Sequence, residues 1–113
     1  MSSNYGKGAR FELDVRDILL EDGWVAVRAA GSHGIIDVLA VKVNEKWFIQ
    51  CRTRGNLSGD ERKELVALTK KHNAVPILAY KAKGNIIFKE VKLLRPDFHY
   101  GVINGKFIRI ENE

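Results

Sequence analysis

The chain has one cysteine, two prolines and no long apolar run, and each scarcity excludes a class of protein. A single thiol, Cys51, cannot form an internal disulfide, so we expect a reducing cytoplasm as the compartment. No uninterrupted apolar stretch approaches the roughly 20 residues that cross a bilayer, so we expect no membrane partner. The first eight residues lack the apolar segment of a secretory signal, so no such signal is expected.

The remaining composition is that of a globular protein. With 113 residues, 45% hydrophobic and 29% charged, the chain is long enough for one modest core, so we expect a single domain over residues 1–113. Nineteen Lys and Arg against fourteen Asp and Glu give a net charge of +5. Such an excess favours a polyanionic partner without deciding it, because many basic proteins bind nothing anionic.

The hydrophobic pattern predicts an α/β fold with a central mixed β-sheet flanked by two helices. Apolar residues three and four apart predict a first helix over 7–21, after a flexible arm at 1–6, and Gly23 is placed to end it. Ser58 and Glu61 have the spacing of a capping box and open a second helix that runs to about residue 72. Strands are expected at 24–29, 34–41, 47–54, 75–80 and 86–89, with a C-terminal β-hairpin at 98–110 that turns at Asn104-Gly105.

Polar residues interrupt two of the apolar strands. Asp37 lies among Ile and Val in the strand 34–41, where its carboxylate must be solvated, paired or bound to a metal. On the next strand Gln50 and Arg52 are two residues apart, so both side chains project to the same face. A carboxylate on one strand beside an amide and a cation on the next is the arrangement of a metal-dependent nuclease site.

These residues resemble the PD-(D/E)xK nuclease superfamily. The matching pattern is a Glu on the first helix, then Gly34-x-x-Asp37-Val-Leu-Ala40, then an apolar strand that ends where the superfamily has acidic-x-Lys. The overall layout, from Lys7 to about Tyr80, is most similar to the archaeal-type Holliday-junction resolvases. Here the last acidic residue is replaced by Gln50 and the lysine by Arg52.

The resemblance implies a restriction-endonuclease-like core and a divalent metal, Mg²⁺ or, as an alternative, Mn²⁺. Its metal ligands would be Glu12, Asp37, the amide oxygen of Gln50 and the backbone carbonyl of Cys51. Without the resemblance Glu12 would be an ordinary surface residue at the edge of the buried stripe. Arg52 stays protonated and cannot act as a base, but it can stabilise negative charge on a phosphate. The Cys51 side chain alternates to the opposite face and is interpreted as a small core residue.

The loop before Asp37 and several basic residues are candidates for contacting DNA. Ser32 matches a loop serine near the resolvase site, where it is a candidate catalytic and DNA-contacting residue. His33 could serve as a general base, although loop histidines are more often exposed and inert. The basic residues expected on the same face are Lys7, Arg10, Arg28 and Arg54, and the alternative for Lys7 and Arg10 is that they only solvate the first helix.

Three functions follow from the resemblance. The first is a metal-dependent, structure-selective endonuclease that cuts branched DNA as a homodimer, because paired cuts need two sites related by symmetry. The second is a weakly active or inactive homologue that binds branched DNA, because Gln50 and Arg52 depart from the pattern. The third is another nuclease of the superfamily that acts on ordinary duplex.

Overall fold

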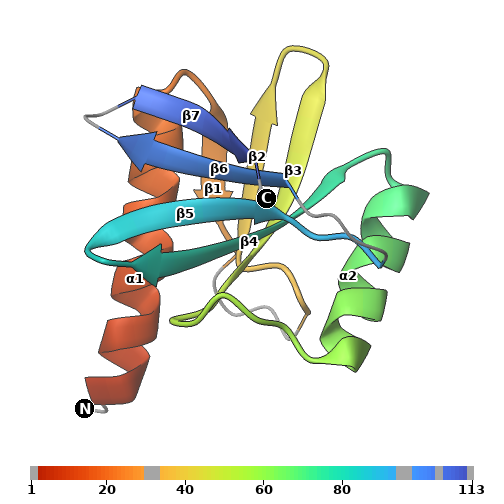
Figure 1. Ribbon diagram of the computed structural model, residues 1–113, viewed down its shortest axis with the longest axis horizontal. Helices are drawn as coiled ribbons and strands as arrows, with labels where there is room; N and C mark the ends of the chain where they lie inside the picture. Colours follow the sequence, from red (N-terminus) through yellow and green to blue (C-terminus); the bar gives the residue numbers. More distant parts are fainter. Residues whose placement is uncertain (1–2, 30–33, 94–97, 104–105, 112–113) are drawn as a thin grey trace.

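The structure is a computed structural model that describes residues 3–29, 34–93, 98–103 and 106–111, with side chains described for 8–29 and 34–93. The described residues form two helices and seven strands, with three strands after the first helix and four after the second (Figure 1). In chain order they are α1 (Ser3–Glu21), β1 (Val25–Arg28), β2 (Val38–Lys42), β3 (Glu45–Cys51), α2 (Gly59–Lys71), β4 (Val75–Ala82), β5 (Asn85–Glu90), β6 (Phe98–Ile103) and β7 (Lys106–Glu111).

All seven strands form one mixed sheet, and their order in the sheet is their order in the chain. Every neighbouring pair is antiparallel except β3 and β4, which run parallel with Gln50 opposite Leu78. A parallel pair needs a crossover, and α2 supplies it. The mixed sheet flanked by two helices confirms the predicted fold class.

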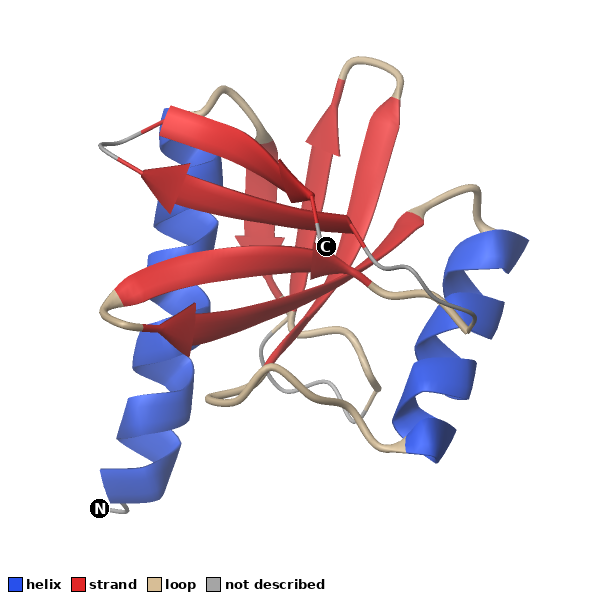
Figure 2. Cartoon of the chain, in the orientation of Figure 1, coloured by secondary structure: helices blue, strands red, loops and turns tan. Residues whose placement is uncertain are grey.

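The two helices cover opposite faces of the sheet, as the alternation along β4 shows (Figure 2). Ile77 and Ala79 belong to the core cluster under α1, whereas Leu78 and Tyr80 pack in the cluster under α2. The α1 cluster is the larger and centres on Trp47, whose ring lies 4.6 Å from that of Trp24 between centroids. Cys51 is buried in this cluster, which confirms it as a core residue.

The helix ends follow local chemistry that the sequence predicts. Gly23 has a φ of 93°, the left-handed conformation expected at the end of α1. Ser58 caps α2: its side chain accepts from the Glu61 backbone N–H, and the Glu61 carboxylate accepts from the Ser58 N–H, so the capping box is confirmed.

Three predicted boundaries are wrong. The strand expected over 47–54 ends at Cys51, so Arg52 and Arg54 follow β3 instead of lying on it. α1 begins at Ser3, within the residues expected to form a flexible arm, because Ser3–Gly8 continues the same helical backbone into the amphipathic segment. The strand expected to begin at Gly34 begins at Val38, so Asp37 immediately precedes β2. Ile35 and Ile36 instead pack in the α2 cluster, which requires the chain to bend before Asp37. Strands β6 and β7 pair where the C-terminal hairpin is predicted, and its turn, 104–105, lies outside the described residues.

Candidate active site

The candidate site lies at one end of the sheet, where β1 and β3 end and β2 begins. The segment 34–37 before β2 and the loop after β3 meet at this end (Figure 2). Backbone hydrogen bonds fix them there: the Asp37 N–H donates to the Ile49 carbonyl at 2.8 Å, and the Arg52 N–H donates to the Ala79 carbonyl at 2.9 Å. The residues before β2 and after β3 are therefore held by strands of the central sheet.

Glu12 reaches this end from α1 and forms an ion pair with Arg28, the last residue of β1. The Arg28 Nε donates to Glu12 Oε1 at 2.6 Å, and both side chains are about four-fifths buried, with exposed fractions of 19% and 20%. A largely buried charged pair of this kind holds the Glu12 carboxylate toward the sheet. Arg28 thus contacts a candidate metal ligand.

Asp37 is oriented by the β3 backbone. Its Oδ2 accepts a hydrogen bond from the Cys51 N–H at 2.8 Å. Burial raises the pKa of the Asp37 carboxyl above its ordinary value, and the nearby Glu12 charge raises the pKa further. The Cys51 hydrogen bond and the positive charges of Arg52 and Arg28 oppose this rise. The negative charge of Glu12 near the Asp37 carboxyl makes an electrostatic site that favours a cation.

Gln50 carries a buried acceptor, and it lies in β3 between Ile49 and Cys51, whose backbone groups hydrogen-bond to Asp37. Its side chain is 4% exposed, and its Oε1 has no hydrogen-bond partner among the described residues. An unsatisfied buried amide oxygen is costly, and such groups in native structures generally have a bound ion, a water or a functional reason. Cys51, next along the strand, has a thiol whose pKa is raised by burial first and by the Asp37 charge second, so it stays protonated and unreactive.

Arg52 follows β3 and is held by two side-chain contacts. Its Nη1 donates to the Cys51 carbonyl at 3.0 Å, and its Nη2 donates to Glu61 Oε2 at the start of α2. Glu61 and Arg52 also form an ion pair, with about a third of each side chain exposed. The alternation of Gln50 and Arg52 to one face agrees with this contact, because α2 covers that face of the sheet.

The residues present fit a divalent, oxygen-seeking cation. Glu12 and Asp37 supply two carboxylates, and the unsatisfied Gln50 Oε1 supplies a neutral oxygen of the kind that Mg²⁺ accepts. Within the described ranges no group of three or more His, Cys, Asp and Glu could hold a metal, which agrees with the replacement of the third acidic residue by Gln50. The donor set is thus hard and oxygen-based, not suited to a soft, thiolate-bound metal.

The other predicted site residues are placed unequally. Ser32 and His33 lie outside the described residues, and Lys7 lies on α1 without a described side chain. Arg10 is on α1 with 80% of its side chain exposed, 3.8 Å from Asp14 one turn later. Arg54 is exposed in the loop after β3, so its side chain is accessible from solvent. The DNA contacts of these residues stay predictions.

Two partnerships were missed from the sequence. Arg28 is predicted as a phosphate contact but pairs with Glu12, and Glu61 is predicted as a capping residue but also pairs with Arg52. Glu12 and Arg28 are 16 residues apart on different elements, and no spacing rule connects them. Opposite charges on elements that are neighbours in the chain were the available signal, and that signal is common to many unrelated pairs.

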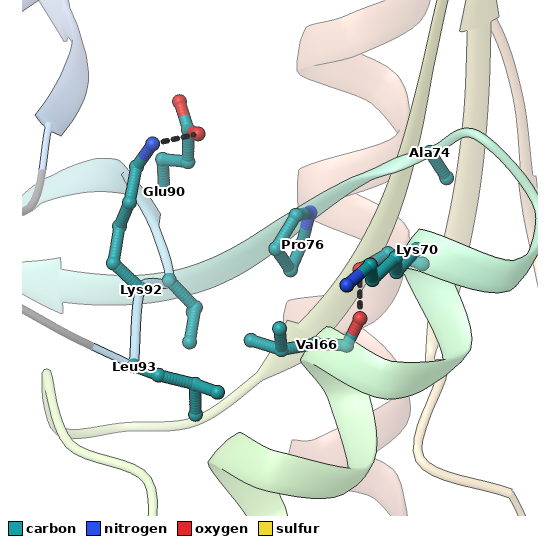
Figure 3. A pocket seen from close by; sticks show the side chains of 9 residues that line it. Val66, Lys70, Ala74, Pro76, Glu90, Lys92 and Leu93 are labelled. Carbon is teal, nitrogen blue, oxygen red and sulfur yellow. Dashed lines mark hydrogen bonds and ion pairs between the residues drawn. The ribbon is translucent and has the colours of Figure 1, made fainter.

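A separate cavity of about 400 Å³ lies between α2 and the strands β4 and β5 (Figure 3). Val66, Pro76 and Leu93 line it, together with Lys70 and Lys92 at its rim. None of the candidate site residues borders it. It is therefore distinct from the cluster of charged residues at the end of β3.

Comparisons with known proteins show which family and fold the chain resembles. A sequence model of the family described as "Archaeal holliday junction resolvase (hjc)" matches residues 3–108. The chain is 24% identical over 132 aligned positions to the crossover junction endodeoxyribonuclease Hjc of Methanocaldococcus jannaschii, covering 99% of this chain and 98% of that protein. The solved structure of Archaeoglobus fulgidus Hjc, a Holliday junction resolvase, superposes with a TM-score of 0.66 at 25% identity, over 91% of this chain and 87% of that one. The core is thus restriction-endonuclease-like, as predicted. None of the described helices combines the length and apolar character needed to cross a membrane.

Proposed function

The chain belongs to the archaeal Holliday junction resolvase family of the PD-(D/E)xK nuclease superfamily, and on that premise we propose that it is a Mg²⁺-dependent endonuclease that cuts branched DNA. The observation that carries the proposal is the proximity of the Glu12 and Asp37 carboxylates, together with the β3 backbone that holds Asp37 on either side of Gln50. The Gln50 Oε1 atom is buried and unsatisfied among the described residues. This arrangement supplies oxygen ligands and negative charge of the kind that a divalent metal needs.

Each residue has a role that its surroundings permit. Glu12, Asp37 and the Gln50 amide oxygen would hold Mg²⁺, which when bound activates water and neutralises charge on the phosphate. The Cys51 carbonyl is the fourth candidate ligand; it now accepts from Arg52 Nη1, so that contact would be shared or exchanged. Arg52 donates to a phosphate oxygen and stabilises the charge that develops there, since it cannot take up a proton at neutral pH.

The substrate we propose is a branched DNA junction. Basic residues near the site, with Arg54 exposed beside it, would contact phosphates, and no motif in the sequence is suited to reading base edges. Recognition would then depend on DNA shape. Ser32 and His33 are proposed to approach the DNA from the loop before Asp37.

The decisive experiment compares cleavage of an end-labelled four-way junction with that of a matched linear duplex in Mg²⁺, Mn²⁺ or EDTA. We expect paired, metal-dependent cuts near the branch point, abolished by Asp37→Ala and by Glu12→Ala while junction binding survives. Asp17→Ala is the matched control, because Asp17 is an exposed carboxylate of α1 that pairs with Arg16.

The two alternative functions give different results in the same assay. Tight junction binding without cutting in either metal would mean that replacement of the acidic residue by Gln50 and of the lysine by Arg52 has abolished the chemistry. Equal cutting of junction and duplex would instead make the protein a duplex nuclease. The inactive alternative is favoured by one observation, the presence of Gln50 where the superfamily has an acidic residue.

We also propose that the active form is a homodimer, because two symmetric cuts on one junction need two copies of the site. Sedimentation analysis is expected to show a dimer in the absence of DNA. Mixed dimers of wild type and Asp37→Ala would nick only one strand of a junction, whereas a monomeric enzyme in the same mixture would still cut both.

A further inference from the structure

The Glu61 carboxylate connects the start of α2 to the active-site arginine. One of its oxygens, Oε1, accepts from the Ser58 N–H at 3.1 Å as part of the capping box. The other oxygen, Oε2, accepts from Arg52 Nη2. The Glu61 side chain thus accepts a hydrogen bond from the helix cap with one oxygen and from the Arg52 guanidinium with the other.

The capping contacts hold the Glu61 carboxylate in place independently of its contact with Arg52. Glu61 is the third residue of α2, and the Ser58 hydroxyl accepts from its backbone N–H at 3.1 Å, so both ends of the residue are held. The cap itself lies on the crossover that follows β3, and the Arg52 backbone is bonded to β4 through Ala79. The partner of Arg52 is therefore a rigid group on a rigid element.

Holding the Arg52 side chain in one place has an entropic cost that anchoring contacts offset. The side chain is long and loses considerable rotational freedom when it is fixed. Its guanidinium has five N–H donors in a planar fork, so anchoring contacts to Cys51 and Glu61 leave other donors for a phosphate oxygen. The fork can be anchored on one side and bind DNA on the other.

We infer that Glu61 is a positioning residue that holds the Arg52 guanidinium at the active site. The inference rests on the proposed function, in which Arg52 stabilises charge on the phosphate. It gives Glu61 a role beyond helix capping and explains how arginine serves where the superfamily has lysine. Glu61 does not touch the substrate and acts only through Arg52.

Two variants separate this role from capping. Glu61→Gln keeps the capping box, since Gln is accepted there and its amide oxygen can accept from the Ser58 N–H. Its NH₂ group then faces the guanidinium and cannot accept a hydrogen bond, so Arg52 loses its anchor. Ser58→Ala does the reverse, because it weakens the cap and leaves the Glu61 carboxylate facing Arg52.

The test measures single-turnover junction cleavage at saturating enzyme, junction Kd, and the mobility of the Arg52 side chain by ¹⁵Nε relaxation in the free protein. We expect Glu61→Gln to slow cleavage about tenfold with little change in Kd, as expected for a misplaced catalytic group. The same substitution is expected to have no further effect in an Arg52→Ala background. Ser58→Ala should lower the melting temperature but cleave at a rate close to wild type.

The inference would be overturned if Glu61→Gln cleaved as fast as wild type. It would also be overturned if the fold-reductions in cleavage rate caused by Glu61→Gln and Arg52→Ala multiplied fully in the double variant. Arg52→Lys is expected to slow cleavage, because the ammonium cannot span both anchors as the fork does; faster cleavage would also count against the inference. If wild type does not cleave, the proposed function fails and the relaxation data decide alone. Arg52 ordered in wild type and Ser58→Ala but mobile in Glu61→Gln supports positioning, and unchanged order in all three refutes it.

Discussion

Asp37 is a carboxylate that the fold makes costly to ionise. Its folded pKa is raised by burial, so the protonated form is favoured in the folded state relative to the unfolded chain. The corresponding stability is fully present below the ordinary pKa of 3.8 and is lost as the pH rises through the raised folded value. At neutral pH without metal, ionised Asp37 therefore destabilises the protein.

Asp37→Asn should consequently raise the melting temperature of the metal-free protein at pH 7, because the amide oxygen can still accept from the Cys51 N–H. The advantage should shrink as the pH falls toward 3.8. Mg²⁺ should stabilise wild type more than the variant, since a cation that binds only the folded state raises the melting temperature. Thermal melts between pH 3 and pH 8 with and without Mg²⁺ check this; a melting temperature unaffected by the substitution at pH 7 would contradict it.

Gln50 tests the same electrostatics from the opposite direction. Gln50→Glu would add a third carboxylate at a position that is 4% exposed, on the strand whose backbone holds the Asp37 carboxylate. We expect a lower melting temperature without metal and a lower Mg²⁺ concentration for half-maximal cleavage. Gln50→Ala is the matched control, because it removes the amide oxygen without adding charge and should weaken the Mg²⁺ response.

The sequence predicts the candidate site residues, whereas their partners appear only in the structure. Asp37 and Gln50 stand out as polar residues among apolar ones, and Glu12 is singled out by the superfamily resemblance alone. The Glu12–Arg28 and Arg52–Glu61 pairs depend on which elements meet in space, which no local rule specifies. Asp37 is expected within a strand but immediately precedes β2, because Ile35 and Ile36 pack in the α2 cluster instead of continuing that strand.

At the scale of elements, α2 depends on few contacts for its attachment to the sheet. Only Leu65 and Thr69 of this helix are buried, and Leu65 packs against Leu78 and Val91 in the smaller cluster. Leu65→Ala should cost about 3 kcal/mol in the free energy of unfolding, as large-to-small changes in cores do. Leu68→Ala, on the half-buried side of the same helix, should cost less. Urea unfolding monitored by circular dichroism measures both, and equal losses would contradict the predicted orientation.

Element boundaries were predictable where capping chemistry fixes them. Ser58 and Glu61 defined the start of α2, and Gly23 defined the end of α1. The start of α1 was not predictable, because residues 3–8 include two glycines that suggest an arm. In the structure these residues continue the helical backbone of α1. The parallel pairing of β3 and β4 follows from the crossover, which the order helix, strand, helix, strand already contains.

At the scale of the whole molecule, the net charge of +5 should make junction binding depend strongly on salt. The logarithm of the binding constant should fall linearly with the logarithm of salt concentration, with a slope of about −0.9 per phosphate contact. Arg54→Ala should reduce the magnitude of that slope by about one contact. Lys46→Ala is the control, because Lys46 is exposed near the opposite end of β3; an equal change in slope would show that the effect is one of net charge alone.

The strand order of the sheet also has a consequence for how the protein folds. Because β1 to β7 lie side by side in chain order, three of the six strand pairs are separated by only two residues, and the β3–β4 pair is the one joined through a helix, α2. Chains rich in such local contacts fold quickly. We therefore expect the docking of α2 to be the slowest folding step. The same step brings Glu61 to Arg52, so the candidate active site forms only when the sheet is complete.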